Sequence, residues 1–128
     1  MNDLFDVDLS REQKEPEDEF LTKVIDGIEV PTQRRHFYSA NILSCEVGTT
    51  GYCGGDSGNG GRTYIKISDG CSTDLRCKII KDDKFRPEYH VDGVEIVLGG
   101  DCELDTIIDA FEYAAKVLKE KRDNKNKS

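Results

Sequence analysis

The chain has 128 residues and a formal net charge of −8. This length suits a single domain with a core of its own, and the acidic balance argues against binding duplex nucleic acid, which needs a basic surface. The sequence has no apolar run long enough to cross a membrane and no signal peptide at its acidic start, so we expect a cytoplasmic protein without membrane partners. The chain has five cysteines, an odd number, and their spacing matches no zinc site. We therefore expect small side chains with reduced thiols, as is usual in the cytoplasm.

Charge and apolar content divide the chain into three parts. Residues 1–19 carry eight acidic side chains, and we expect a mobile segment because such a composition buries too little apolar surface. Residues 20–121 hold the apolar patterns of a single α+β ligand-binding domain. Residues 122–128 form a charged tail that we expect to be frayed.

Two elements are predicted before the glycine-rich part of the chain. Apolar residues between Phe20 and Ile28 recur at near-helical spacing and predict one short helix, which Gly27 and Pro31 would end. Residues 36–46 are rich in aromatic and branched side chains and contain no breaker, which predicts a strand.

Further strands are predicted after the glycine-rich part. Patterns of alternating and branched apolar side chains predict strands over residues 62–68, 75–80, 88–91 and 94–98. Asp69 with Gly70 predicts a tight turn after the first of these, and Asp92 with Gly93 predicts a hairpin that joins the last two. Residues 81–87 are predicted to form a polar loop.

The last element has the strongest pattern. Asp101 follows two glycines and suits a helix N-cap. An apolar face at helical spacing is formed by Leu104, Ile107, Ile108, Phe111, Ala114, Ala115 and Leu118. Acidic residues crowd the first turn and lysines the last, as the helix dipole favours.

The predicted fold class is therefore α+β: an antiparallel sheet of about five strands followed by one long C-terminal amphipathic helix, which covers one face of the sheet. One helix covers only part of such a sheet. We expect the remaining apolar surface to meet another subunit.

A glycine-rich loop is the strongest candidate for a functional site. Seven of the fourteen residues from 48 to 61 are glycine, and Arg62 follows. Glycine-rich backbone can turn N–H groups toward an anion, and a guanidinium suits a phosphate. The alternative is a floppy spacer, which would be richer in serine, lysine and glutamate. The residues expected to bind a small phosphorylated ligand here are Gly54, Gly55, Asp56, Ser57, Gly58, Asn59, Gly60, Gly61, Arg62, Thr63 and Tyr64.

Other candidate ligand contacts lie elsewhere in the chain. Arg35 stands among cations and aromatics that can stack on a base, although the start of any strand can look the same. Phe85 and Arg86 combine an aromatic with a cation, and Phe85 can equally dock in a crevice. Gly100 can present a free N–H group, but a tight turn before an N-cap explains it as well, because nearby acids compete with an anion.

Several chemistries can be set aside. Gly55-Asp56-Ser57-Gly58 mimics the nucleophile segment of trypsin-like proteases, but the chain is too short for two barrels and neither of its histidines lies in a recognisable motif. A nucleotide-binding P-loop would lead into a helix, whereas Arg62 and Thr63 enter a predicted strand. The aspartates fit no metal-binding spacing. We therefore expect no metal, no cofactor and no catalytic residues.

Residues 36–120 resemble the first type of phage Thoeris anti-defence proteins, which act as sponges for immune signals. The resemblance rests on Ser39-Ala-Asn-Ile-Leu-Ser-Cys-Glu-Val-Gly, Gly51-Tyr-Cys-Gly-Gly-Asp-Ser-Gly-Asn-Gly-Gly-Arg-Thr-Tyr, Ser72-Thr-Asp, and Val94-Glu-Ile-Val-Leu-Gly-Gly-Asp with its helix. It implies a small oligomer, a hexamer built from dimers, that binds glycocyclic ADP-ribose, and in some members cyclic trinucleotides at separate sites, without cleaving them. Cys102 stands where a hydroxyl residue is expected in the family, which puts one contact near Gly100 in doubt.

The leading hypothesis is a non-catalytic protein that sequesters a cyclic nucleotide messenger and associates with itself as a dimer or hexamer. Arg62 would contact a phosphate, and Phe85 or Tyr64 would stack on the base. One alternative is an enzyme that cleaves such a nucleotide. Another is an acidic inhibitor that mimics nucleic acid through residues 1–19.

Overall fold

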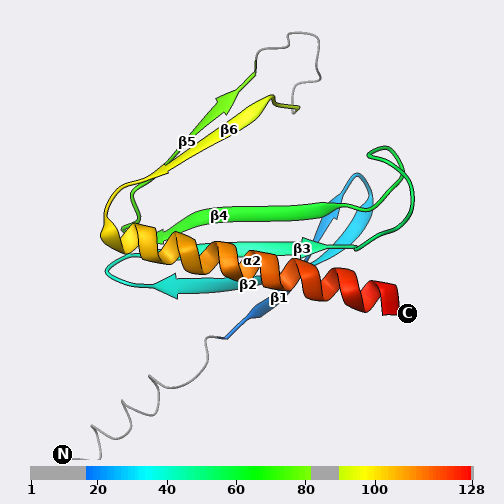
Figure 1. Ribbon diagram of the computed structural model, residues 1–128, viewed down its shortest axis with the longest axis horizontal. Coiled ribbons are helices and arrows are strands. Elements are labelled where there is room, and N and C mark those ends of the chain that lie inside the picture. The colour runs from blue at the N-terminus through cyan, green and yellow to red at the C-terminus, as the bar shows by residue number, and fades with distance from the viewer. Residues whose placement is uncertain (1–16, 82–89, 128) are drawn as a thin grey trace, which may run out of the picture.

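The computed structural model describes residues 17–81 and 90–127 and confirms the α+β fold class (Figure 1). Four antiparallel strands form the main sheet in the order β1-β2-β3-β4, and two more strands form a separate hairpin. The strands of the main sheet are β1 (Glu19–Ile25), β2 (Ile28–Tyr38), β3 (Ile42–Thr49) and β4 (Thr63–Cys71). The hairpin consists of β5 (Leu75–Ile80) and β6 (Gly93–Leu98), and the C-terminal helix is α2 (Asp101–Lys127).

The helix predicted between residues 20 and 28 is wrong, because β1 and β2 form a hairpin there. Ile25 pairs with Ile28, so Asp26 and Gly27 alone make the turn. Both have positive φ, 54° and 79°, as the favoured two-residue hairpin turns require. Pairing with a neighbouring strand therefore overrides the helical spacing of the apolar residues.

The strand predicted over residues 36–46 is two strands. β2 ends at Tyr38 and β3 begins at Ile42, and the chain reverses between them. Asp69 and Gly70 lie inside β4 rather than in a turn, and the chain turns only after Cys71. β6 pairs with β5, from Leu75 opposite Leu98 to Ile80 opposite Gly93, so the hairpin predicted at Asp92 and Gly93 does not form in this way.

The helix α2 begins at Asp101 as predicted and continues to Lys127, through most of the segment expected to be a frayed tail. It lies across β3 (Figure 1). The core between them consists of Leu43, Cys45 and Val47 from β3 and Ala110, Tyr113, Ala114 and Val117 from α2. The amide of Asn41 fixes one end of this packing by donating to Thr73 Oγ1 at 3.0 Å and Thr106 Oγ1 at 3.1 Å.

The predicted apolar face of α2 is only partly the buried one. Thr106, Ala110, Tyr113 and Val117 turn toward the sheet, whereas Leu104, Ile108 and Phe111 remain exposed. The helix is thus rotated about its axis from the expected orientation, because the ring of Tyr113 packs edge-on against Phe37 of β2 and takes up the space beside the sheet.

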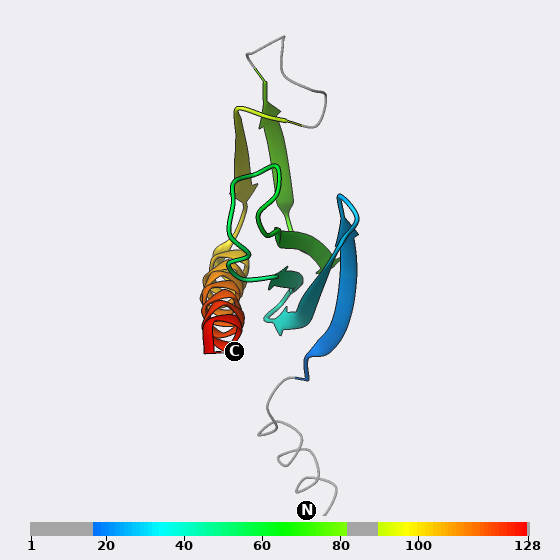
Figure 2. The same ribbon diagram turned by 90° about the vertical axis from the view of Figure 1, so that its right-hand side faces the viewer.

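The hairpin β5–β6 extends away from the main sheet and the helix (Figure 2). One of its faces is wholly apolar, formed by Leu75, Cys77, Ile79, Val94, Ile96 and Leu98. Of these residues only Leu75 packs against the core. A two-stranded hairpin by itself is only marginally stable in water.

Candidate ligand-binding site

A pocket of about 540 Å³ lies between the glycine loop (residues 48–61) and the C-terminal part of α2. Its size falls in the usual range for small-molecule sites. The lining consists of Thr49, Gly51, Tyr52, Cys53, Gly54, Gly55, Gly61, Thr63, Leu118, Lys119 and Arg122. The backbone of the loop and the ring of Tyr52 thus face two cations of α2.

The base of the glycine loop is closed by hydrogen bonds between its two ends. The N–H of Thr50 donates to the carbonyl of Arg62 at 3.0 Å, and the N–H of Arg62 donates to Thr50 Oγ1 at 3.1 Å. The hydroxyls of Thr49 and Thr63 lie 2.8 Å apart. These bonds hold the two walls of the pocket at a fixed separation.

The tip of the glycine loop folds back on Asp56. The carbonyl of Asp56 accepts from the N–H of Gly60 at 2.6 Å, and its carboxylate accepts from the N–H of Gly58 at 2.9 Å. The N–H groups of Gly58 and Gly60, which the sequence suggested for an anion, are therefore used within the tip. They do not line the pocket.

Gly61 is required for close approach of the loop's two ends. A Cβ there would touch Thr50 Oγ1 and lie 2.5 Å from the carbonyl oxygen of Gly51. Only glycine lets the returning chain pass so near residues 50–51.

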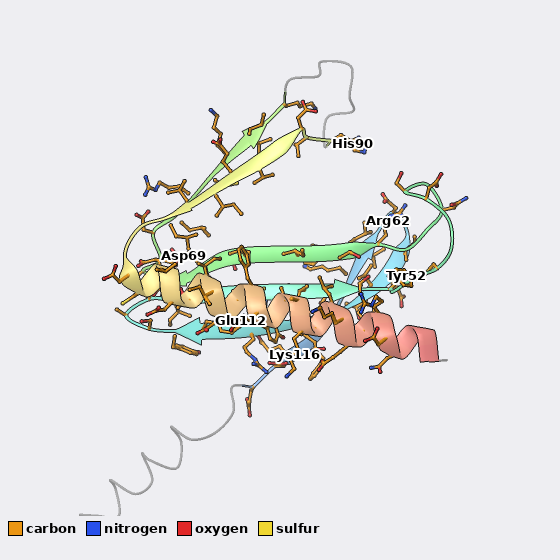
Figure 3. All side chains as sticks on the ribbon, in the orientation of Figure 1. Tyr52, Arg62, Asp69, His90, Glu112 and Lys116 are labelled. Atoms are coloured by element: carbon orange, nitrogen blue, oxygen red, sulfur yellow. The ribbon has the colours of Figure 1, made fainter. Side chains whose placement is uncertain are left out.

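The structure places Arg62 outside the pocket lining. Its Nε donates to Asp26 Oδ2 at 2.8 Å, and its Nη1 donates to the carbonyls of Gly60 and Gly61, both at 3.1 Å. The side chain is 16% exposed. Figure 3 shows Tyr52 close to the C-terminal half of α2, with Arg62 on the side of the β1–β2 turn. Arg62 thus stabilises the conformation of the loop and does not line the pocket.

The cations of the pocket come from α2. Lys119 and Arg122 are three residues apart and so share one side of the helix. The Nε of Arg122 donates to Asp123 Oδ1 at 3.0 Å, and this carboxylate raises the pKa of Arg122, with a smaller effect of the same sign from Tyr52. The sequence indicated Lys119 only as a partner of the helix dipole, and it placed Arg122 in the charged tail. The three-residue spacing between Lys119 and Arg122 was the signal in the sequence that could have indicated a shared site.

The predicted contacts divide between the pocket and other parts of the fold. Gly54, Gly55, Gly61 and Thr63 line the pocket. The remaining predicted residues of the loop, which are Asp56, Ser57, Gly58, Asn59, Gly60 and Arg62, do not.

Three further predicted contacts lie elsewhere in the described structure. The ring of Tyr64 lies under Lys23 Nζ, 5.4 Å from its centroid. Arg35 bonds Asp18 at 2.6 Å and stacks on Tyr113. Gly100 precedes the first turn of α2, at the end of the helix opposite the pocket. Phe85, Arg86 and most of the acidic segment 1–19 lie outside the described residues.

A second polar cluster lies between β1, β2 and β3. His36 Nδ1 is 2.6 Å from Ser44 Oγ, and its Nε2 is 3.3 Å from Glu19 Oε1. Hydrogen bonding to Arg34 lowers the pKa of Glu19 and holds it as a carboxylate. Ser44 is only 4% exposed, so a substrate cannot reach its hydroxyl. The arrangement links the three strands through their side chains.

The described residues contain no cluster of three or more histidine, cysteine or carboxylate side chains that could hold a metal ion. No helix in this part of the chain is both long and apolar enough to span a membrane. Comparisons of the chain with protein-family models, with curated proteins and with solved structures found no match.

Proposed function

We propose that this protein binds a small phosphorylated molecule of the nucleotide class and withdraws it from solution without altering it. The observation that carries the proposal is the lining of the pocket, where glycine-loop backbone and Tyr52 face Lys119 and Arg122. In line with the family resemblance, the proposed ligand is a cyclic nucleotide messenger, with glycocyclic ADP-ribose first and cyclic trinucleotides second. The protein would then act as a phage anti-defence sponge in the bacterial cytoplasm.

The pocket offers one group for each part of such a ligand. Lys119 and Arg122 would neutralise phosphates, and the ring of Tyr52 offers a stacking surface for a base. The C-terminal end of a helix carries about half a negative charge, which opposes an anion. Lys119 and Arg122 oppose that effect, and the charge of Arg122 is partly offset by its hydrogen bond to Asp123.

The same lining favours binding over chemistry. None of its side chains is a carboxylate or an imidazole, the groups that most often act as general acid or base. Its nucleophilic groups are the Cys53 thiol, the Lys119 amine and the hydroxyls of Thr49, Tyr52 and Thr63, and the lining has no carboxylate or imidazole to activate them.

Calorimetric titration with glycocyclic ADP-ribose, ADP-ribose and a cyclic trinucleotide tests the proposal. We expect Lys119→Ala and Arg122→Ala each to raise Kd about tenfold, because each removes one charged hydrogen bond of roughly 1.5 kcal/mol. Lys116→Ala is the matched control, since this exposed lysine of the same helix does not line the pocket. Equal affinity in all four proteins would remove the pocket as the site.

Heat release separates sequestration from cleavage. After incubation with the nucleotide, the protein is denatured and the ligand is measured by mass spectrometry. Full recovery of intact nucleotide is expected, and a cleaved product that forms with time would establish an enzyme instead.

Self-association belongs to the same proposal. The uncovered apolar face of β5–β6 and the exposed apolar residues of α2 support it, because large exposed apolar areas mark interaction surfaces.

A further inference from the structure

The apolar rows that pack the sheet against α2 end in two threonines. In β3, Cys45 and Val47 belong to the core, and Thr49 is next on the same face of the strand. In β4, Ile67 packs against this core, and Thr63, four residues earlier, lies on the same face and pairs with Thr49. Both threonines line the pocket, and we call them its strand end. Since valine has a similar shape and lacks only the hydroxyl, the pocket carries polar groups where the core would carry methyl groups.

The hydroxyl of Thr49 has a partner for its proton and for each of its lone pairs. It accepts from the N–H of Gly51 at 3.1 Å and donates to the carbonyl of Arg62 at 3.2 Å. The remaining lone pair is left for Thr63 Oγ1, 2.8 Å away, so Thr63 is the donor in that contact. The opposite direction would make one hydrogen bond fewer, because the single proton of Thr49 would leave the carbonyl of Arg62. Thr63 is exposed, and its oxygen therefore presents lone pairs to the pocket and no proton.

The neighbouring polar side chains at the base of the glycine loop donate inward as well. The thiol of Cys53 donates to Thr50 Oγ1 at 3.5 Å, and the hydroxyl of Thr50 donates to the carbonyl of Gly51 at 3.0 Å. The two cations of α2 in the lining, in contrast, carry donors only. The strand end of the pocket thus offers a hydrogen-bond acceptor, whereas the helix offers donors.

We propose that Thr63 accepts a hydrogen bond from a ribose hydroxyl of the ligand, so that the pocket selects ribonucleotides over their deoxy analogues. This inference deepens the nucleotide binding proposed above and rests on it. An ionised phosphate offers acceptor oxygens, which are unfavourable beside the lone pairs of Thr63 and favourable beside Lys119 and Arg122. In any nucleotide the sugar is bonded to both the base and the phosphate, so this contact is compatible with stacking on Tyr52 and with ion pairs to α2.

Calorimetric titration of Thr63 variants with ADP and ADP-ribose tests the contact. Thr63→Val keeps the shape of the side chain but removes the acceptor, and it should raise Kd about threefold to tenfold, the range for one neutral hydrogen bond. Thr63→Ser keeps the hydroxyl and should bind as the wild type does. Thr22→Val is the matched control, because Thr22 is exposed on β1 and does not line the pocket. Equal affinities of Thr63→Val and the wild type would overturn the proposal.

Deoxy ligands separate a hydroxyl contact from a change in the shape of the loop. The wild type should bind 2′-deoxy-ADP or 3′-deoxy-ADP about threefold to tenfold more weakly than ADP, and Thr63→Val should bind that analogue and ADP equally. If Thr63→Val weakens ADP and both analogues by the same factor, Thr63 acts through the loop and the proposal is wrong. Inosine diphosphate lacks the amino group of adenine and should bind the wild type as ADP does. A Thr63 effect that disappears with inosine diphosphate alone would assign the contact to the base and refute the ribose contact.

The same titrations distinguish this inference from the function on which it rests. Weaker binding by Lys119→Ala together with unchanged binding by Thr63→Val would refute the ribose contact and leave nucleotide binding in place. A wild-type protein that binds neither ADP, ADP-ribose nor the cyclic nucleotides would refute both.

Discussion

The guanidinium of Arg62 contacts the carboxylate of Asp26, 36 residues earlier in the sequence, with Nε and Oδ2 2.8 Å apart. Asp26 lies in the tight turn between β1 and β2, and Arg62 ends the glycine loop. Because Nη1 of Arg62 also binds the carbonyls of Gly60 and Gly61, this contact ties one wall of the pocket to a rigid turn of the sheet.

Arg62→Ala is therefore expected to act through the shape of the loop. It should lower the free energy of unfolding by about 1–3 kcal/mol, since charged hydrogen bonds to two carbonyls and an ion pair are lost. Asp26→Asn should cost less, about 0.2–1 kcal/mol, because it keeps a residue that tolerates positive φ and removes one exposed charge. Urea unfolding of both variants and of their combination measures the coupling. Strictly additive losses would show that the two side chains do not act together.

The substitution Gly61→Ala should damage the pocket, whereas Gly58→Ala should be almost neutral. A Cβ at residue 61 would overlap Thr50 and Gly51, while one at residue 58 would make an ordinary contact, 3.4 Å from Asp56 Oδ1. We expect Gly61→Ala to weaken nucleotide binding at least tenfold and to lower the melting temperature. The same calorimetric titration checks both variants, and equal affinities would mean that the base of the loop is not part of the site.

Cys53 should report on occupancy of the pocket. Cys53, Cys71 and Cys77 are exposed, but of these three only Cys53 lines the pocket. A bound nucleotide should therefore slow alkylation of Cys53 severalfold and leave the rates at Cys71 and Cys77 unchanged, as peptide mass spectrometry can resolve. Uniform rates with and without saturating nucleotide would place the ligand elsewhere.

The buried thiol of Cys45 should cause the free energy of unfolding to decrease at alkaline pH. Burial raises the pKa of this thiol from 9.0 to about 11, so the folded protein keeps a proton that the unfolded chain releases above pH 9. The protonated thiol therefore contributes on the order of 2 kcal/mol to the free energy of unfolding. This contribution is complete below pH 9 and is lost as the pH rises toward 11. Urea unfolding at pH 7, 9 and 10.5 measures it. Cys45→Ala should show a smaller decline, and parallel pH curves for the two proteins would contradict this origin.

Local patterns in the sequence determine several elements. α2 begins at Asp101, the apolar period continues through the helix, and alternation marks β4 and β5. These patterns depend on interactions within a few residues, which the sequence displays directly. The glycine loop is visible for the same reason, since its composition fits only a backbone that turns sharply or approaches another segment closely.

Contacts between residues far apart in the sequence decided the pairing of β1, the orientation of α2 and the lining of the pocket. Phe20 to Ile25 has near-helical spacing, yet it forms β1 because Asp26 and Gly27 allow it to pair with β2. The packing of Tyr113 against Phe37 sets which side of α2 is buried and leaves Leu104, Ile108 and Phe111 exposed. Arg62 turns toward Asp26, and the cations that reach the pocket come from α2, more than fifty residues after the loop begins.

The sequence by itself determined that a glycine loop and a long amphipathic helix exist, because both follow from short-range geometry. Only the tertiary structure decided which cations face that loop, because the direction of a side chain depends on partners far away along the chain.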